Sequence, residues 1–233
     1  GRFSASNCFS AWSDSALSMG KITALTRQKR NPDRINVFID GAFAFGLAEI
    51  TAAYLRVGQT LSPEEIEKLQ GADQVEKAKD VAIRYIEYRP RSVAETRRHL
   101  QKKEYPDAVI EQVVERLEAV NLLNDADFAR YWVEQRETFK PRSKIAIQQE
   151  LRQKGIDRTL IDTAVTDVDE LAAATQAAEA KARRWGTLPE QQFRQKLGGF
   201  LQRRGFGYDI VREVTEALWA EYGTEDSEAN DPY

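Results

Sequence analysis

The stretch Leu151-Arg-Gln-Lys-Gly-Ile156 decides the fold of this chain, because its pattern returns 50 residues later as Leu201-Gln-Arg-Arg-Gly-Phe206. A related stretch, Leu100-Gln-Lys-Lys-Glu-Tyr105, precedes it by 51 residues. Each copy ends in basic residues, a turn and an apolar or aromatic residue. The glycines of the second and third copies suit the left-handed conformation that commonly follows a helix. A period near 50 residues is typical of a tandem structural repeat.

A second repeated motif marks the start of the same helix. Pro90-Arg-Ser92 returns as Pro141-Arg-Ser143, again 51 residues later. Ser92 and Glu95 form a predicted capping box, in which each side chain bonds the other residue's backbone N–H. Beyond each turn, apolar residues recur three and four positions apart, as expected for the buried face of a helix. Each unit is therefore predicted to be helix–turn–helix–turn–helix, and units of this size should stack to share their cores.

The N-terminal part has a different pattern. Alternating apolar residues predict strands, and Asp40-Gly41 is a strong two-residue hairpin signal. The strands are expected over residues 22–27, 34–39 and 42–47. A short helix follows over residues 50–55. Ser62-Pro63 then opens another helix, with Ser62 as the N-cap and Glu65 completing a capping box.

The predicted fold is mainly helical: three tandem three-helix repeats in an elongated, curved array, behind a small N-terminal segment that contains a β-hairpin. We expect residues 1–18 to be an added or misassigned extension, with translation starting at Met19; a disordered natural tail is the alternative. The remaining predicted boundaries are 19–71 for the β-containing segment, 72–120, 121–168 and 169–222 for the repeats, and 223–233 for an acidic disordered tail.

Composition excludes several classes of protein. The 233 residues have 42% hydrophobic and 30% charged content, and no apolar run approaches the length of a membrane span. Residues 221–233 hold five acidic residues and no basic ones, and removing those five changes the net charge from −3 to +2. A body so near neutrality does not favour strong nonspecific DNA binding. We therefore expect a cytoplasmic protein without a membrane partner, and nothing in the sequence requires more than a monomer.

No catalytic, cofactor or metal site is predicted. The chain has one cysteine and one histidine, and it lacks the motifs of phosphate loops, serine hydrolases and zinc proteases. His99 is interpreted as a helix-surface residue, and Asp125 and Asp127 as acids at a helix N-terminus. Four aromatic residues of the second repeat are interpreted as core, with a platform for nucleobases as the alternative. These four are Phe128, Tyr131, Trp132 and Phe139.

The informative polar feature is a recurrence of basic residues at equivalent places. They cluster at the end of the middle helix and around the turn before it, so stacking could align them in a row. Such a row would suit an acidic protein surface or a phosphate backbone; the alternative is that these charges only solvate helices and complement their dipoles. The predicted partner-binding residues are Arg89, Arg91, Arg97, Arg98, Lys102, Lys103, Lys140, Arg142, Lys144, Arg152, Lys154, Arg203 and Arg204.

These motifs resemble the RecX family, the regulatory proteins of the RecA recombinase, over about residues 21–222. The resemblance is carried by Asn36-Val-Phe-Ile-Asp-Gly41-Ala-Phe43, Tyr88-Arg-Pro-Arg-Ser92, Leu122-Leu-Asn-Asp-Ala-Asp-Phe-Ala129 and the two glycine-containing turns quoted first. One departure is Lys103-Glu104-Tyr105, which lacks the glycine that is common before the third helix.

The resemblance implies a non-catalytic modulator, most often an inhibitor, in DNA repair and homologous recombination. It would bind RecA along the groove of the RecA–DNA filament and restrain filament growth, ATP hydrolysis, strand exchange and the activity that triggers the SOS response. Weak direct contact with DNA is a further expectation. A helical-repeat protein that binds DNA directly, without RecA, is the alternative function.

Overall fold

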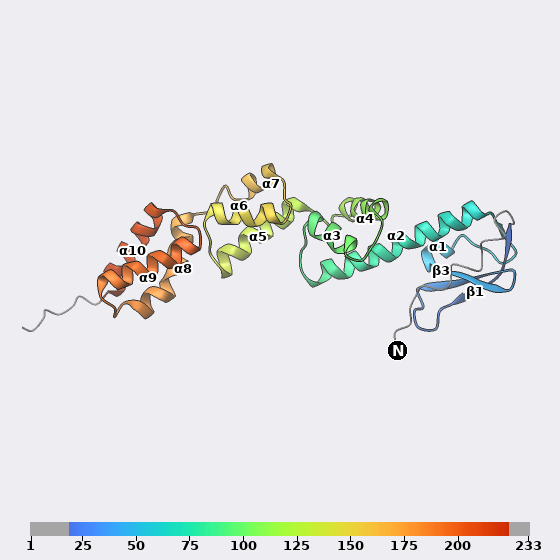
Figure 1. The fold of residues 1–233 in the computed structure, drawn as a ribbon, viewed down its shortest axis with the longest axis horizontal. Coiled ribbons are helices and arrows are strands. Elements are labelled where there is room, and N and C mark those ends of the chain that lie inside the picture. The colour runs from blue at the N-terminus through green and yellow to red at the C-terminus, as the bar shows by residue number, and fades with distance from the viewer. Residues whose placement is uncertain (1–18, 224–233) are drawn as a thin grey trace, which may run out of the picture. The chain divides into compact units, whose positions relative to one another are not determined.

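The computed structural model describes residues 19–223 (Figure 1). The predicted N-terminal extension, and all but the first residue of the predicted acidic tail, lie outside these described residues. Contacts divide the described chain into two compact units. One unit holds residues 19–85 and 99–116, and the other holds residues 86–98 and 117–223.

The first unit contains a four-stranded antiparallel sheet in the order β3-β2-β1-β4. Its elements are β1 (Gly20–Arg27), β2 (Arg34–Ile39), β3 (Ala42–Ala48), the short helix α1 (Glu49–Ala52) and β4 (Thr60–Leu61). The three predicted strands and the short helix are confirmed. The fourth strand was not predicted, because two residues are too few to show an alternating pattern.

The hairpin between β2 and β3 has the predicted turn. Ile39 pairs with Ala42, so Asp40 and Gly41 form a two-residue loop. Their φ angles are 51° and 85°. Two successive positive φ values are the signature of the type I′ turn, whose twist matches the twist of the flanking strands.

Helix α2 (Pro63–Tyr88) begins with the predicted capping box. The backbone N–H of Ser62 donates to the Glu65 carboxylate over 2.7 Å, and the Glu65 N–H donates to the Ser62 hydroxyl over 3.2 Å. The helix then continues without interruption for 26 residues. The boundary predicted between residues 71 and 72 therefore lies inside one helix, which belongs to the sheet at its start and to the first repeat at its end.

Packing and polar contacts attach α2 to the sheet. Ile66 and Leu69 pack against the sheet core, which includes the fully buried Ile22 and Leu47. Asp73, only 3% exposed, accepts hydrogen bonds from the Ala48 backbone N–H and from Arg34, and pairs with Lys77. Burial alone would raise the pKa of Asp73, but these partners hold it below its ordinary value.

Eight further helices complete the described chain: α3 (Val93–Gln101), α4 (Asp107–Ala119), α5 (Asp125–Phe139), α6 (Lys144–Gln153), α7 (Arg158–Ala164), α8 (Glu170–Trp185), α9 (Glu190–Arg203) and α10 (Tyr208–Tyr222). They confirm the predicted mainly helical fold of three three-helix repeats with an N-terminal sheet. The second repeat is α5, α6 and α7, and the third is α8, α9 and α10.

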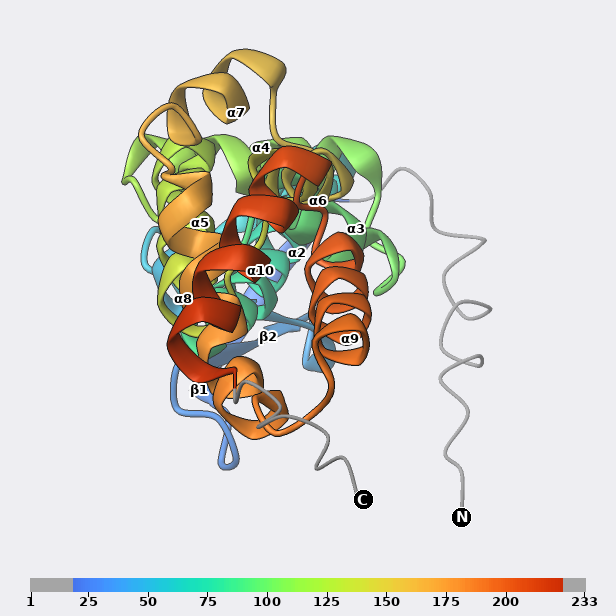
Figure 2. The ribbon, with the colours of Figure 1, turned by 90° about the vertical axis from the view of Figure 1, so that its left-hand side faces the viewer.

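Each of these two repeats has its own apolar core. Phe128, Ile147 and Leu151 are buried in the second repeat. Phe193 and Leu197 are completely buried in the third, where α8, α9 and α10 lie side by side (Figures 1 and 2). No helix within residues 19–223 has the length and apolar character needed to cross a membrane.

We predict that Asp73→Ala lowers the free energy of unfolding by about 3 kcal/mol, because it leaves the Arg34 charge and the Ala48 N–H without a buried partner. Urea unfolding would measure the change. Lys77→Met is the matched control, because the half-exposed lysine contributes under about 1 kcal/mol to the same cluster. Equal, small losses in both variants would contradict this role for Asp73.

Candidate partner-binding surface and the repeat junctions

The repeated turn of the second repeat packs against the start of α3. The Ser92 hydroxyl donates to the Lys154 carbonyl over 2.7 Å, and the Val93 backbone N–H donates to Asp125 over 2.9 Å. Asp125 and Asp127 stand in the first turn of α5, where Asn124 is the N-cap, which confirms their predicted place at a helix N-terminus. The two repeated motifs therefore meet: the serine that starts one middle helix contacts the turn that ends the next.

The same junction occurs between the second and third repeats. The Ser143 backbone N–H donates to the Arg204 carbonyl over 3.3 Å, the position equivalent to the Lys154 carbonyl. The Arg204 guanidinium returns a hydrogen bond to the Pro141 carbonyl over 2.8 Å. Burial, with the nearby Arg142 charge, lowers the pKa of Arg204. Two junctions with the same parts explain why both motifs recur at the same period.

Glycine is required at these junctions for two reasons. Gly155 and Gly205 have φ angles of +81° and +91°, a region that side chains disfavour. A Cβ on Gly155 would lie 2.4 Å from the Ala94 Cβ, and one on Gly205 would lie 2.6 Å from the Ser143 hydroxyl. Glu104, the equivalent residue of the first repeat, also has a positive φ of 63°, but it is exposed. The first repeat does not need a glycine at this position, because no earlier repeat packs on its turn.

A charged cluster around Glu95 strengthens the first junction. This carboxylate, 8% exposed, accepts hydrogen bonds from Arg89 over 3.0 Å and from Lys154 over 2.7 Å. Burial raises the pKa of Glu95, but the bonds and charges of Arg89 and Lys154 outweigh burial and lower it to about 2. The ammonium group of Lys154 also lies 4.9 Å from the centre of the Trp132 ring.

A second carboxylate organises the middle of the second repeat. Glu150 accepts hydrogen bonds from the Trp132 indole over 2.7 Å and from Arg136 over 2.6 Å, and it pairs with Arg142 over 3.2 Å. Trp132 is therefore held by polar contacts at the edge of the core. Phe128 is buried, as predicted, whereas Phe139 is 70% exposed, so its interpretation as core is wrong.

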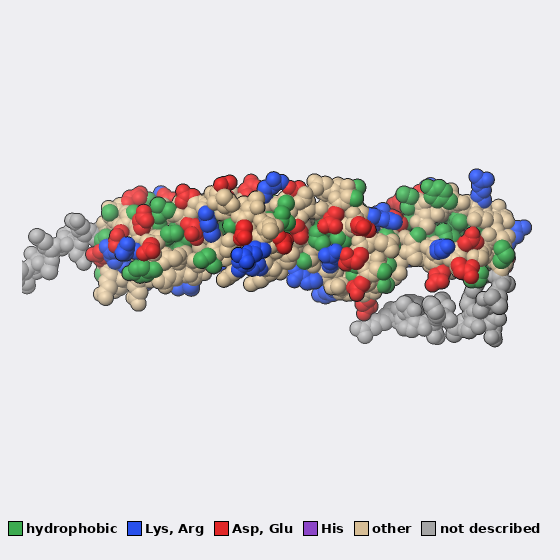
Figure 3. All heavy atoms as spheres, turned by 90° about the horizontal axis from the view of Figure 1, so that it is seen from above, with side chains coloured by type: hydrophobic (Ala, Val, Ile, Leu, Met, Phe, Trp, Pro, Cys, Tyr) green, Lys and Arg blue, Asp and Glu red, His purple; other side chains and the backbone are tan. Residues whose placement is uncertain are grey.

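The structure divides the thirteen predicted partner-binding residues into groups. Six hold hydrogen bonds or ion pairs within the chain: Arg89, Arg98, Arg142, Lys144, Lys154 and Arg204. Five have exposed side chains: Lys102, Lys103, Lys140, Arg152 and Arg203. Arg91 and Arg97 are half-buried and have contacts of their own. The face of the molecule in Figure 3 shows basic and acidic side chains intermixed.

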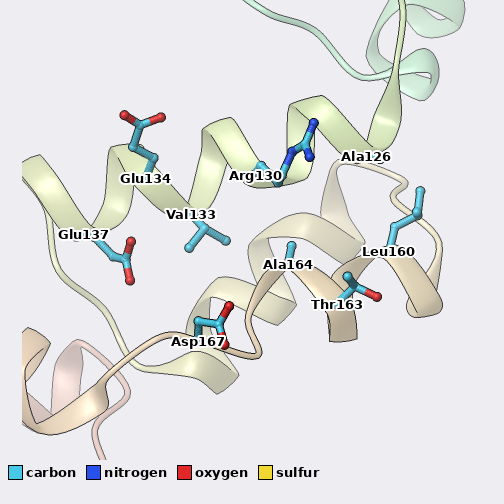
Figure 4. Close-up of a pocket in the computed structure, with 9 residues that line it drawn as sticks. All are labelled: Ala126, Arg130, Val133, Glu134, Glu137, Leu160, Thr163, Ala164 and Asp167. Carbon is cyan, nitrogen blue, oxygen red and sulfur yellow. The ribbon is translucent and has the colours of Figure 1, made fainter.

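A shallow hollow between α5 and α7 was not foreseen from the sequence (Figure 4). It has a volume of about 400 Å³, with Val133 and Ala164 among its apolar lining residues and Glu134, Glu137 and Asp167 among its polar ones. No group of metal-ligating side chains was found among residues 19–223. Arg130 and Thr163 also line the hollow, so its rim carries both charges.

His99 is not simply a helix-surface residue, as the sequence suggested. Its ring stacks on Tyr85, with ring centres 4.0 Å apart and an angle of 2° between the planes. The stack joins α3 to α2 within the first unit, so the histidine is a packing residue.

We predict that Gly155→Ala lowers the free energy of unfolding by about 2–3 kcal/mol. The alanine would have to adopt the left-handed backbone conformation, and its Cβ would clash with Ala94. Gly71→Ala is the control, since a Cβ there meets nothing within 4 Å and alanine favours a helix. Urea unfolding would compare the two variants. A loss at Gly155 no larger than the control's would show that close packing is not required at this junction.

We predict that Glu95 makes stability depend on pH. Because its pKa is lowered from 4.5 to about 2, its contribution is complete above pH 4.5 and is lost as the pH falls through about 2. The wild-type protein should therefore lose about 3 kcal/mol more than Glu95→Gln over this range. Other carboxylates titrate in both proteins and cancel in the difference. Parallel pH profiles of urea unfolding for the two proteins would rule out this contribution.

Comparison with known proteins identifies the family. The model of the RecX N-terminal domain matches residues 20–62, and those of the first, second and third RecX three-helix domains match residues 78–117, 124–165 and 167–215. Regulatory protein RecX of Bacillus velezensis is 32% identical over 88% of this chain and 79% of its own length.

Two further proteins agree with this assignment. Regulatory protein RecX of Bacillus subtilis is 31% identical over 84% of this chain and 76% of its own length. A crystal structure of regulatory protein RecX superimposes with a TM-score of 0.69 at 27% identity, covering 84% of this chain and 99% of that one. The chain belongs to the RecX family of non-catalytic regulatory proteins.

Proposed function

We propose that this protein regulates the RecA recombinase by binding along the groove of the RecA–DNA filament. There it restrains filament growth, ATP hydrolysis and strand exchange. RecA as the partner comes from the family resemblance, and the relatives are named regulatory proteins. In this proposal the protein acts as a cytoplasmic monomer.

One observation carries the proposal: the same junction is built twice along the chain, at Gly155 and at Gly205. Repeats joined by equivalent contacts present equivalent surfaces one after another along the chain. A filament of identical subunits also offers equivalent sites one after another. Because the repeats belong to one chain, binding at one site raises the effective concentration of the next surface at its own site.

The exposed basic residues are the proposed contacts with acidic RecA surface or nearby DNA phosphates. They are Lys102, Lys103, Lys140, Arg152 and Arg203. The other predicted basic residues act indirectly in this proposal, since those with hydrogen bonds at the junctions fix the positions of the helices that bear the exposed ones.

Direct DNA binding without RecA is the second candidate function, and the same exposed cations favour it. Phosphate contacts make affinity fall steeply with salt. Steep, salt-dependent binding of this protein to single-stranded DNA alone would support that alternative. The near-neutral body and the internal use of six of the thirteen basic residues count against it.

We predict that the protein lowers ATP hydrolysis by RecA on single-stranded DNA when present below one copy per RecA. The triple variant Lys102→Glu, Arg152→Glu and Arg203→Glu should need about tenfold more protein for half of this effect, because interface charges change association rates and affinity. Reversing three other exposed cations, Lys68, Arg184 and Arg212, makes the same change in net charge and is the control.

The outcomes separate the possibilities. A rise in ATP hydrolysis would keep RecA as the partner and reverse the sign of regulation. Equal weakening by both triple variants would show that net charge, and not this surface, matters. No effect of the wild-type protein on RecA would contradict the proposed function.

A further inference from the structure

Two exposed aromatic residues occupy the same place in consecutive repeats. Tyr88 is the last residue of α2 and Phe139 is the last residue of α5, 51 residues later. Each is followed directly by a basic residue and then by the Pro-Arg-Ser motif. Their side chains are 86% and 70% exposed, so neither ring contributes to a core.

Several other aromatic residues of this unit are buried in its cores. Phe128, Phe193 and Phe206 are all at least 96% buried. A single exposed aromatic residue needs no explanation, since folded surfaces always contain apolar atoms. An exposed ring at the same position of two repeats is a repeated surface feature. In the sequence it is recognised because each ring lies four residues before the serine that starts the next helix.

Hydrogen bonds and ion pairs hold the chain segment that follows each ring. After Tyr88, the Arg89 guanidinium bonds the Pro90 carbonyl over 2.8 Å and Glu95 over 3.0 Å. After Phe139, Arg142 pairs with Glu150 over 3.2 Å. The serines that follow, Ser92 and Ser143, are buried against the next repeat's turn. Aromatic side chains with two torsions on a fixed backbone lose little entropy on binding, which suits them as anchors.

The third repeat lacks this feature. Its first helix ends at Trp185, and that side chain packs partly buried against the repeat's own core. An exposed ring at the end of the first helix therefore occurs in the first and second repeats, whose middle helices contact the turn of the following repeat.

We infer that Tyr88 and Phe139 are paired anchors that insert into equivalent apolar pockets on two identical subunits of one partner. The inference rests on the proposed function, in which that partner is the RecA filament. Since Phe139 has no hydroxyl group, the shared element is the ring, and recognition is apolar. Two equal anchors match a partner that presents the same pocket twice.

Local charge favours a protein over nucleobases as the occupant. Aromatic residues that stack on bases usually lie in a positively charged groove. Here Arg89 pairs with Glu95 and Arg142 pairs with Glu150, so these two arginines already have partners within the chain, and Lys140 is the exposed cation next to Phe139. An apolar protein pocket with a polar rim fits this surface better.

The test is binding to RecA filaments on single-stranded DNA, by co-sedimentation and by the concentration that gives half of the ATPase effect. Tyr88→Ser and Phe139→Ser should each weaken binding about tenfold, and the double variant about a hundredfold, as expected for aromatic hot spots. Tyr88→Phe should bind like the wild type. A double variant of two other exposed rings, Tyr54→Ser with Tyr208→Ser, is the control and should stay within about twofold.

Each result has one meaning. Loss in the Tyr88 and Phe139 variants alone, at unchanged thermal stability, supports the anchors. Wild-type binding that persists in the double variant overturns the anchors and leaves the proposed function intact. Loss of affinity for single-stranded DNA without RecA would show that the rings stack on bases instead. Absence of wild-type binding to RecA filaments would overturn both proposals.

Discussion

The close approach of a turn to the start of a neighbouring helix is the constraint on which the repeats depend. At Gly155 the turn lies so near Ala94 that no side chain fits between them, and at Gly205 the same is true beside Ser143. Hydrogen bonds from the two serines to equivalent carbonyls then fix the register. Each of these hydrogen bonds joins a polar group at the start of one helix to a carbonyl at the end of another. A short motif at each site therefore connects neighbouring repeats.

This constraint also decides how the basic residues are used. Arg89, Lys154 and Arg204 lie beside the junctions, where carboxylates and carbonyls need donors. Lys103 is equivalent to Lys154 and Arg204, yet its side chain is exposed, since the turn of the first repeat has no repeat ahead of it. Basic residues at this repeat position thus stabilise the structure at two sites, and the third one is exposed.

Much of the fold could be predicted because local rules agree with the tertiary structure. The capping box at Ser62, the hairpin at Asp40 and the glycine turns at 155 and 205 are each set by a few neighbouring residues. The strand β4 was not predicted, because its two residues form a strand only by pairing with β1, which is far away in the sequence. The uses of the basic residues and the exposure of Phe139 depend on which repeat packs where, and no local pattern contains that information.

The two ends of the repeated region differ from its middle in a way that has an evolutionary consequence. Glu104 places a side chain where a preceding repeat would have to pack, and Phe193, at the position equivalent to Ser143, is buried within its own repeat. The second repeat alone carries both halves of the junction. It is therefore an interchangeable module: duplication of its coding segment would lengthen the protein with a serine and a glycine turn at each new junction, whereas copies of either outer repeat would lack one of the two.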